Sequence, residues 1–235
     1  MDGLLDEFGS GDAQARAESW RYSRQALRAL EQQPFQNAEG NVAVPPALIE
    51  RFDWPQTRGH RLVFVNGHFA PQLSRAARGP DGVCATNLHR PPGGGADILA
   101  AHLTRYADYR RHPFTALNTA FFEDGAFVRV PEGTYVEEPI HLLFLSVPGA
   151  EPTVSHPRVL ILAEPGSRAT FVETYAGIGD GVYFTNAVTE LVAGEGSGKS
   201  SLEAARSSTP PAQTLVQGGM RLSIRTVERP AWAQR

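Results

Sequence analysis

The stretch AFVRVPEGTYVEEPIHLLFLSVPGA, at residues 126–150, decides the fold of this chain, and its pattern continues to residue 195. Short apolar runs alternate there with turns that contain Pro and Gly. The runs are AFVRV (126–130), IHLLFLSV (140–147), RVLILA (158–163), RATFVETY (168–175) and VYFTNAVTELV (182–192). Runs rich in Val, Ile, Phe, Tyr and Thr between turn residues are typical of β-strands. The sequence therefore predicts an all-β region here.

Two of these runs, 140–147 and 158–163, hardly alternate between apolar and polar residues. A strand with one wet face alternates, whereas a continuous apolar run predicts a strand that is covered on both faces. Because residues 126–195 show no helical periodicity, we expect other strands to provide the cover. Either a two-sheet sandwich or a β-solenoid of stacked coils would do so. The short spacing between turns favours the solenoid, although no strict sequence period is visible.

The bulk composition excludes several classes of protein. The chain has 235 residues, 41% of them hydrophobic, and a net charge of −3, which gives no reason to expect nucleic acid or an anionic membrane as partner. Cys84 is the only cysteine, so no intrachain disulfide exists, which fits a reducing cytosol. The acidic N-terminus is no signal peptide and no apolar run is long enough to span a membrane. We therefore expect a cytoplasmic protein.

The residues before about 113 predict a mixed α/β region. The expected elements are a helix at 13–30, a short helix that Pro46 opens, a β-hairpin at 61–73, a strand at 83–88 and a helix at 96–109. The hairpin signal is the dipeptide Asn66-Gly67 between apolar runs, because both residues tolerate the positive φ of a type I′ turn. Pro113 prevents the last helix from continuing.

The strand pattern fails after residue 195. Lysine occurs once, at Lys199, Phe and Tyr are absent from 196–235, and the net charge changes from negative before residue 196 to positive after it. Only residues 220–227 alternate like a strand. We therefore predict an irregular tail and interpret it as an out-of-frame translation product. Translation of the parent DNA in the other two frames beyond codon 195 tests this, because one frame should resume apolar strands and Gly/Pro turns.

The octapeptide AGEGSGKS (193–200) fits the loose phosphate-loop pattern, in which Lys199 would contact phosphate oxygens and Ser200 would hold Mg²⁺. A P-loop nucleotide-binding hydrolase is therefore an alternative function. The context argues against it, because residues 201–206 are too short for the helix that must follow and no helix-wound parallel sheet is predicted. A β-solenoid carbohydrate-active enzyme is a further alternative, but the strands do not supply the clustered carboxylates that it needs.

No catalytic, cofactor-binding or metal-ligating residue is predicted. The spacing of the histidines does not suggest a metal site; they lie at 60, 68, 89, 102, 112, 141 and 156. Each pair of neighbouring acids, at 123–124 and 137–138, points to opposite faces of a strand, so neither predicts an acid/base dyad. His141 is expected to be a hydrogen-bonded strand residue, and Cys84 a small, partly buried one.

Four stretches together resemble the SufD side of the SufB/SufD family, scaffold components of the SUF iron–sulfur cluster assembly machinery. They are ESWRYS (18–23), RLVFVNGHFAPQLS (61–74), FTALNTAFFEDGAFVRVPEGTYVEEPIHLLF (114–144) and PRVLILAEPGSRATFVETYAG (157–177). The resemblance implies an N-terminal helical region, a right-handed parallel β-helix and a C-terminal helical domain. It also implies a cytosolic complex with SufB and the ATPase SufC, in which an iron–sulfur cluster is assembled. We expect no cofactor bound directly by this chain.

The β-helix of the family continues well past the position of residue 195. That later part holds the SufC-docking helices, the SufB-facing strands and the Cys and His residues implicated in cluster assembly. We therefore expect docking surfaces to be missing here and transfer no functional residue. The prediction is a mainly β protein with an α/β N-terminal region (1–113), a partial right-handed parallel β-helix (114–195) and an irregular tail (196–235). The predicted function is a non-enzymatic, SufD-like scaffold subunit.

Overall fold

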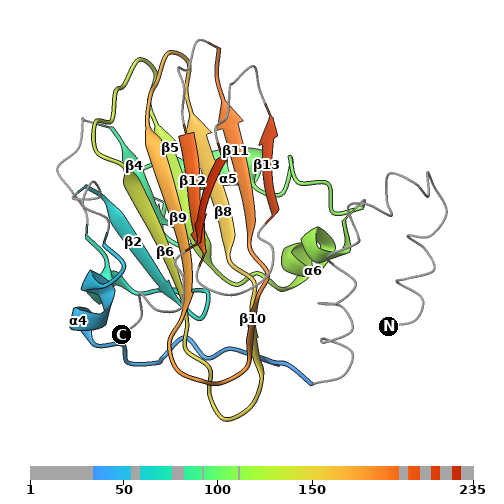
Figure 1. Ribbon diagram of the computed structural model, residues 1–235. Coiled ribbons are helices and arrows are strands. Elements are labelled where there is room, and N and C mark those ends of the chain that lie inside the picture. The colour runs from blue at the N-terminus through green and yellow to red at the C-terminus, as the bar shows by residue number, and fades with distance from the viewer. Residues whose placement is uncertain are drawn as a thin grey trace.

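The computed structural model describes residues 34–53, 59–75, 82–91, 93–110 and 112–195, together with three strands beyond them. Strands are the predominant secondary structure of this part, and the helices are short (Figure 1). A mainly β protein is therefore confirmed. The predicted helix at 13–30 lies outside the described residues.

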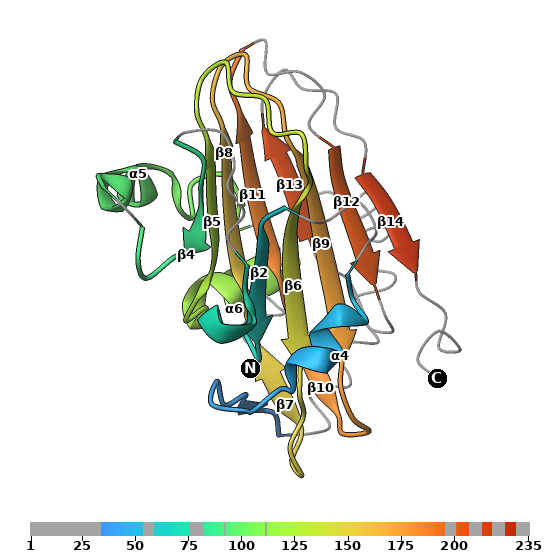
Figure 2. The ribbon, with the colours of Figure 1, turned by 90° about the vertical axis from the view of Figure 1, so that its left-hand side faces the viewer.

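The strands form two large sheets and one small one (Figures 1 and 2). The orders are β14-β12-β9-β6-β2-β3, β13-β11-β8-β5-β4 and β1-β7-β10, and every pairing is parallel except β2–β3 and β4–β5. The bounds are β1 (Gln36–Asn37), β2 (Arg61–Val65), β3 (His68–Phe69), β4 (Cys84–Asn87), β5 (Gly125–Val130), β6 (Ile140–Ser146), β7 (Thr153–Ser155), β8 (Arg158–Ala163), β9 (Thr170–Gly177), β10 (Tyr183–Thr185), β11 (Val188–Ala193), β12 (Ser201–Arg206), β13 (Gln213–Gln217) and β14 (Ile224–Glu228).

Successive strands visit the three sheets in a repeating order. β5 lies in the five-stranded sheet, β6 in the six-stranded sheet and β7 in the small one, and β8, β9 and β10 repeat this round. Each strand of the second round pairs in parallel with its counterpart in the first. Each round therefore packs directly on the one before it.

The main core lies between the two large sheets. Every residue of β6 and of β8 is buried, which confirms that these runs are covered on both faces. Phe64, Phe144 and Tyr175 occupy matching positions in β2, β6 and β9, and their ring centroids are 4.9 and 5.0 Å apart. Stacked aromatic pairs contribute about 0.5–1.5 kcal/mol each beyond their area burial. This column of stacked rings therefore stabilises the packing of β2, β6 and β9 against one another.

Helices help to cover the outer faces of the large sheets, which corrects the expectation that strands alone would do so (Figure 2). α4 (Pro46–Glu50), the short helix that Pro46 was predicted to open, packs Ile49 against the six-stranded sheet. α5 (Gly95–His102) packs Leu99 against Phe127 of the five-stranded sheet. Both helices precede the strand-rich region in sequence, so its periodicity cannot indicate them.

α5 is shorter than the helix predicted at 96–109. It ends at His102 because three of the amides that follow donate to the buried carboxylate of Glu190 rather than to helical carbonyl groups. Thr104 has a φ of +64° there, which is incompatible with a right-handed helix. A further helix that was not predicted, α6 (Pro113–Phe121), follows and opens on proline, which suits a first helical turn.

The predicted hairpin is confirmed. β2 and β3 are antiparallel with Val65 opposite His68, and the two residues between them, Asn66 and Gly67, have φ of +53° and +87°. Two left-handed residues in a two-residue loop are typical of a type I′ turn. The side-chain amide of Asn66 also donates to the backbone carbonyl of Glu39, so the turn is anchored to the preceding segment.

We expect Gly67→Val to lower the free energy of unfolding by about 1–2 kcal/mol, because a β-branched residue resists a positive φ. A Cβ at this position would also lie 3.3 Å from the Cβ of Ser155. Urea unfolding measures the loss. Gly149→Val is the control, since a Cβ at Gly149 meets nothing within 4 Å. Equal stability of the two variants would contradict the importance of the turn.

The structure differs from the predicted strands at two places. The run 182–192 is two strands, β10 and β11, which belong to different sheets because the chain turns at 186–187. Within the predicted irregular tail, the structure describes β12, β13 and β14, which pair in register with β9, β11 and β12. The strand predicted at 83–88 is confirmed as β4. The out-of-frame origin of the tail stays a prediction.

Candidate functional site

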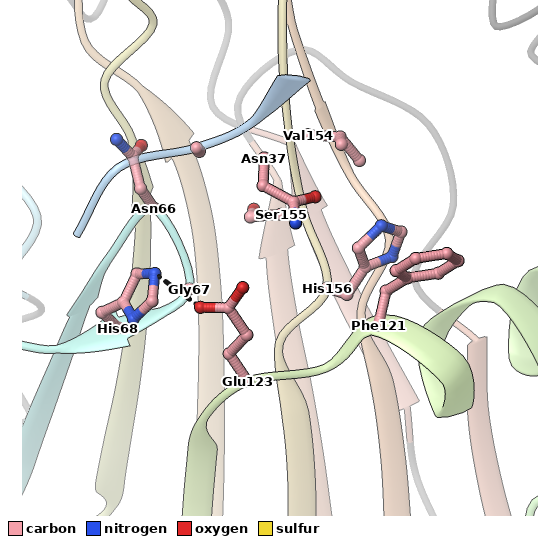
Figure 3. Close-up of a pocket in the computed structure, with 10 residues that line it drawn as sticks. Asn37, Asn66, Gly67, His68, Phe121, Glu123, Val154, Ser155 and His156 are labelled. Carbon is pink, nitrogen blue, oxygen red and sulfur yellow. Dashed lines mark ion pairs between the residues drawn. The ribbon is translucent and has the colours of Figure 1, made fainter. Parts of the chain in front are cut away.

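Four segments that are distant in sequence meet at a small pocket that opens to solvent, with a volume of about 20 Å³, which is roughly the space of one water molecule (Figure 3). They are β1, the β2–β3 hairpin, the C-terminal end of α6 with the residues after it, and the end of β7. On one side of the pocket, Nε2 of His68 lies 3.4 Å from Oε2 of Glu123. On the other side, the ring of Phe121 lies beside that of His156, with 5.8 Å between their centroids.

The imidazole of His156 is buried, and its hydrogen bonding is fixed. Nδ2 of Asn186 lies 2.8 Å from the carbonyl oxygen of Phe114 and 3.2 Å from Nδ1 of His156. Because a carbonyl oxygen only accepts, Nδ2 donates one hydrogen to it and the other to Nδ1. Burial lowers the pKa of His156 to about 4, so the ring is neutral at pH 7 and carries its proton on Nε2.

A chain of buried hydrogen bonds leads from this imidazole towards the loop after α5. The backbone carbonyl of Asn186 accepts from Nδ2 of Asn118, and Oδ1 of Asn118 accepts from Nη1 of Arg158. Nε of Arg158 donates to Oε2 of Glu190 at 3.2 Å, and Nη2 lies 2.8 Å from the same oxygen. Both charged side chains are fully buried. Ions buried in this way need further hydrogen bonds to offset their lost hydration.

Glu190 obtains those hydrogen bonds from the loop itself. Its carboxylate accepts from the backbone amides of Thr104, Tyr106 and Ala107, each at 2.8 Å. Hydrogen bonds to a charged acceptor are stronger than those between neutral groups, so the loop is held firmly to β11. No motif singled out Glu190 or Arg158 in the sequence, although Glu190 is a lone charge inside the run VTELV and Arg158 is the lone charge that begins the run RVLILA.

The other titratable residues that the sequence singled out belong to strands or to the segments between them. Nε2 of His141 lies 2.9 Å from Oγ1 of Thr174, which confirms the prediction of a hydrogen-bonded strand residue. The acids at 123–124 diverge as predicted, because Asp124 is buried while Glu123 lines the pocket. Cys84 is half-buried, and burial raises the pKa of its thiol.

The motif AGEGSGKS begins in a stack of matching turns. β5, β8 and β11 end in register, and each is followed by a turn with Gly: PEG (131–133) after β5, EPG (164–166) after β8, and Gly194-Glu195 after β11. The amide of Gly133 in the first turn donates to the carbonyl of Pro165 in the second, and Gly166 in the second donates to Glu195 in the third. Gly194 and Glu195 of the motif are therefore explained as part of a third turn that stacks on its predecessors.

The rest of that motif gains no support from the described residues. Lys199 and Ser200 lie outside them. Residues 201–206, where a phosphate loop needs its helix, form strand β12, which pairs with β9 and β14. Within the described ranges, no group of three or more His, Cys, Asp or Glu could hold a metal ion.

We expect the folded protein to lose stability as the pH falls from about 6.5 towards 4. Burial lowers the pKa of His156 and also that of His60, where Glu138 opposes the effect. In this interval the unfolded chain binds protons that the folded chain does not, so acid favours unfolding. The lowered pKa of His156 alone should reduce the free energy of unfolding by about 3 kcal/mol over this pH interval.

Urea unfolding at neutral pH and near pH 4 measures this dependence. His156→Gln should remove most of it, whereas His89→Gln should keep it, because His89 is exposed. The comparison uses the difference between the two pH values within each variant, so a general loss of stability does not affect it. An equal pH dependence in both variants would show that His156 is not its source.

Two family models match the chain. One is described as the SufBD protein N-terminal region and matches residues 9–142, which is more than half of the chain. This chain belongs to the SufB/SufD family. The other model, described as the SUF system FeS cluster assembly, SufBD core domain, matches residues 145–210. The resemblance found in the sequence is thus confirmed.

Several members of the SufB/SufD family are similar to this chain. An iron–sulfur cluster assembly SufBD family protein of Synechocystis is 33% identical over 188 residues, which is 77% of this chain and 41% of that protein. SufD of Bacillus subtilis is 25% identical over 183 residues, which is 75% of this chain and 40% of SufD. The chloroplastic SufBD family protein ABCI8 of Arabidopsis thaliana is 36% identical over 166 residues, covering 65% of this chain and 29% of ABCI8.

This chain therefore spans less than half the length of the relatives described above. Among the helices that the structure describes, none is long and apolar enough to cross a membrane.

Proposed function

We propose that this chain acts as a non-enzymatic, SufD-like scaffold subunit in cytosolic iron–sulfur cluster assembly, together with SufB-like and SufC-like subunits. The observation that carries the proposal is the family match over residues 9–142 and 145–210. The similarity to SufD of Bacillus subtilis supports the SufD-like role. The buried pair of Arg158 and Glu190 holds a loop to a strand, which is a structural use of charge and suits a scaffold.

We propose further that the parallel sheets are the beginning of a right-handed parallel β-helix that starts near residue 113 and that β12, β13 and β14 continue beyond residue 195. The in-register rounds, the column of aromatic rings and the stack of turns support it, because each round of a solenoid contacts mainly its neighbours. The docking helices that the family resemblance implies belong to a part of the family beyond residue 195. We therefore expect a SufC-like subunit on its own not to be retained by this chain.

Gene deletion in the source organism tests the scaffold function. Activity of enzymes that need an iron–sulfur cluster should fall in the deletion strain and return when the chain is expressed again. A dehydrogenase without a cluster serves as the control and should not change. Unchanged activity of the cluster enzymes would contradict the proposal. Capture of a SufC-like subunit by the purified chain would contradict only the expectation about docking surfaces.

The alternative of a P-loop hydrolase that uses Lys199 and Ser200 is not favoured, because residues 201–206 form a strand. We expect no ATPase activity and no saturable binding of Mg-ATP at micromolar concentrations. Lys199→Ala should behave like the parent chain in an equilibrium binding assay. Saturable binding that disappears in Lys199→Ala would contradict this prediction.

A further inference from the structure

Helix α6 turns its polar side chains towards the sheets and its apolar side chains away from them. Its polar residues are Thr115, Asn118 and Thr119. The first two are fully buried, and Oγ1 of Thr119 accepts from Nη1 of Arg158. A helix on the surface of a globular protein normally has the opposite arrangement. The hydrogen bonds to Arg158 explain why the inner side is polar, but they do not explain the apolar outer side.

The outer side of α6 is a continuous apolar stripe, which we call the α6 stripe. Its members are Pro113, Ala116, Leu117, Ala120 and Phe121. Ala120 and Phe121 are exposed, the latter by 52%, and the other three are half-buried. An apolar surface of this kind indicates a contact with a further segment or molecule.

The described part of the chain begins close to α6. The ring of Phe35 lies 6.3 Å from that of Phe184, and the ring of Phe184 lies 6.0 Å from that of Phe114 in α6. Only two ring contacts therefore connect the first described residues to this helix. Leu30 precedes Phe35 by five residues, which span at most about 18 Å when fully extended. The segment before residue 34 is thus tethered beside α6.

The tethered segment has the apolar pattern that the α6 stripe requires. Residues 13–30, for which the sequence predicts a helix, place Trp20, Leu27 and Leu30 on one side at helical spacing. Amphipathic helices bind apolar surfaces through anchors spaced in this way. A short tether gives the segment an effective concentration in the millimolar range, so it has an advantage over a second copy of the chain.

We propose that residues 13–30 dock on the α6 stripe as an amphipathic helix, with Trp20 and Leu27 against Leu117 and Phe121. The polar side of α6 then binds Arg158, and its apolar side binds the N-terminal segment. In this arrangement α6 is a middle layer, and the N-terminal segment shields the apolar side chains that α6 presents to solvent.

Paramagnetic relaxation enhancement in the full chain tests the proposal. A nitroxide is attached at Glu123→Cys, an exposed position two residues beyond the α6 stripe, in a chain whose single native thiol is removed by Cys84→Ser. The indole N–H signal of Trp20, assigned with Trp20→Phe, should be lost. A nitroxide at Tyr135→Cys is the control, because Tyr135 is exposed and follows the opposite end of β5. It should leave the signal unchanged.

Variants of the stripe provide a second readout. The double variant Leu117→Gln/Phe121→Gln should restore the signal of Trp20 in the nitroxide-labelled chain. It should also speed trypsin cleavage after Arg21, Arg24 and Arg28 by about tenfold, because an undocked segment is open to the protease. The matched control, Tyr135→Gln, changes an exposed aromatic residue elsewhere and should keep the parent rate. Urea unfolding of both variants verifies that the sheets are folded.

Three results would overturn the proposal. One is a signal of Trp20 that the nitroxide at residue 123 does not broaden. Another is an equal rate of trypsin cleavage in the stripe variant and in Tyr135→Gln. The third comes from a mixture of isotope-labelled chains without nitroxide and unlabelled chains that carry it. Loss of the Trp20 signal in that mixture would show that the segment docks on a second copy. None of these results bears on the scaffold function, because the gene-deletion test uses cluster enzymes as its readout.

Discussion

Arg158→Met should lower the free energy of unfolding by about 3–5 kcal/mol, because it leaves the carboxylate of Glu190 buried without its counter-charge. Both side chains are fully inaccessible to solvent, so water cannot replace the lost guanidinium. The same substitution removes the donor to Oδ1 of Asn118. Urea unfolding at neutral pH measures the loss.

Arg129→Met is the matched control for that variant. Arg129 pairs with Glu164 at 2.6 Å, but both side chains are about one-third exposed, so the pair should contribute less than about 1 kcal/mol. The double variant Arg158→Met/Glu190→Gln should be more stable than Arg158→Met alone, since it removes the orphaned charge. If Arg158→Met lowered the free energy of unfolding no more than Arg129→Met, the buried pair of Arg158 and Glu190 would contribute no more to stability than an exposed pair.

Gly125→Ala should prevent stable folding of the sheets. A Cβ at Gly125, the first residue of β5, would lie 1.7 Å from the carbonyl oxygen of Arg158 and 2.7 Å from its amide nitrogen. Both atoms belong to the backbone of the neighbouring strand β8, so no side chain can move aside. The strands would have to separate where they pair, and such a change costs more than about 3 kcal/mol.

Circular dichroism and the elution volume in gel filtration measure this outcome. Gly149→Ala is the control, because a Cβ there meets nothing within 4 Å. It should elute and melt like the parent chain. A folded Gly125→Ala protein with the melting temperature of the control would show that β5 and β8 do not approach each other as closely as the structure has it.

Features that depend on local sequence were predictable. Asn66-Gly67 identified the hairpin because the φ preference belongs to these residues themselves. The runs 140–147 and 158–163 indicated strands buried on both faces, because an apolar run carries that information without its partners. The four stretches at 18–23, 61–74, 114–144 and 157–177 were enough to indicate the family.

Features that depend on distant partners were not predictable. α5 stops at His102 because of Glu190, a residue more than eighty positions away. The local periodicity therefore overestimated the length of this helix. The pocket is assembled from four separate segments, and its residues form no motif in the sequence. The strands after residue 200 carry a weak apolar pattern, and they are recognised by their register with β9 and β11.

The hydrogen bonds between Glu190 and the loop also impose an order on synthesis. Thr104 and its acceptor are 86 residues apart in the chain. At about 5–20 residues per second, a ribosome needs roughly 4–17 s to add the acceptor after the loop has been made. During that interval the carboxylate of Glu190 is not available to accept from the loop amides. A nascent chain paused before β11 should therefore be cut by proteases at residues 103–107, and the same peptide bonds should become resistant as soon as Glu190 has emerged from the exit tunnel.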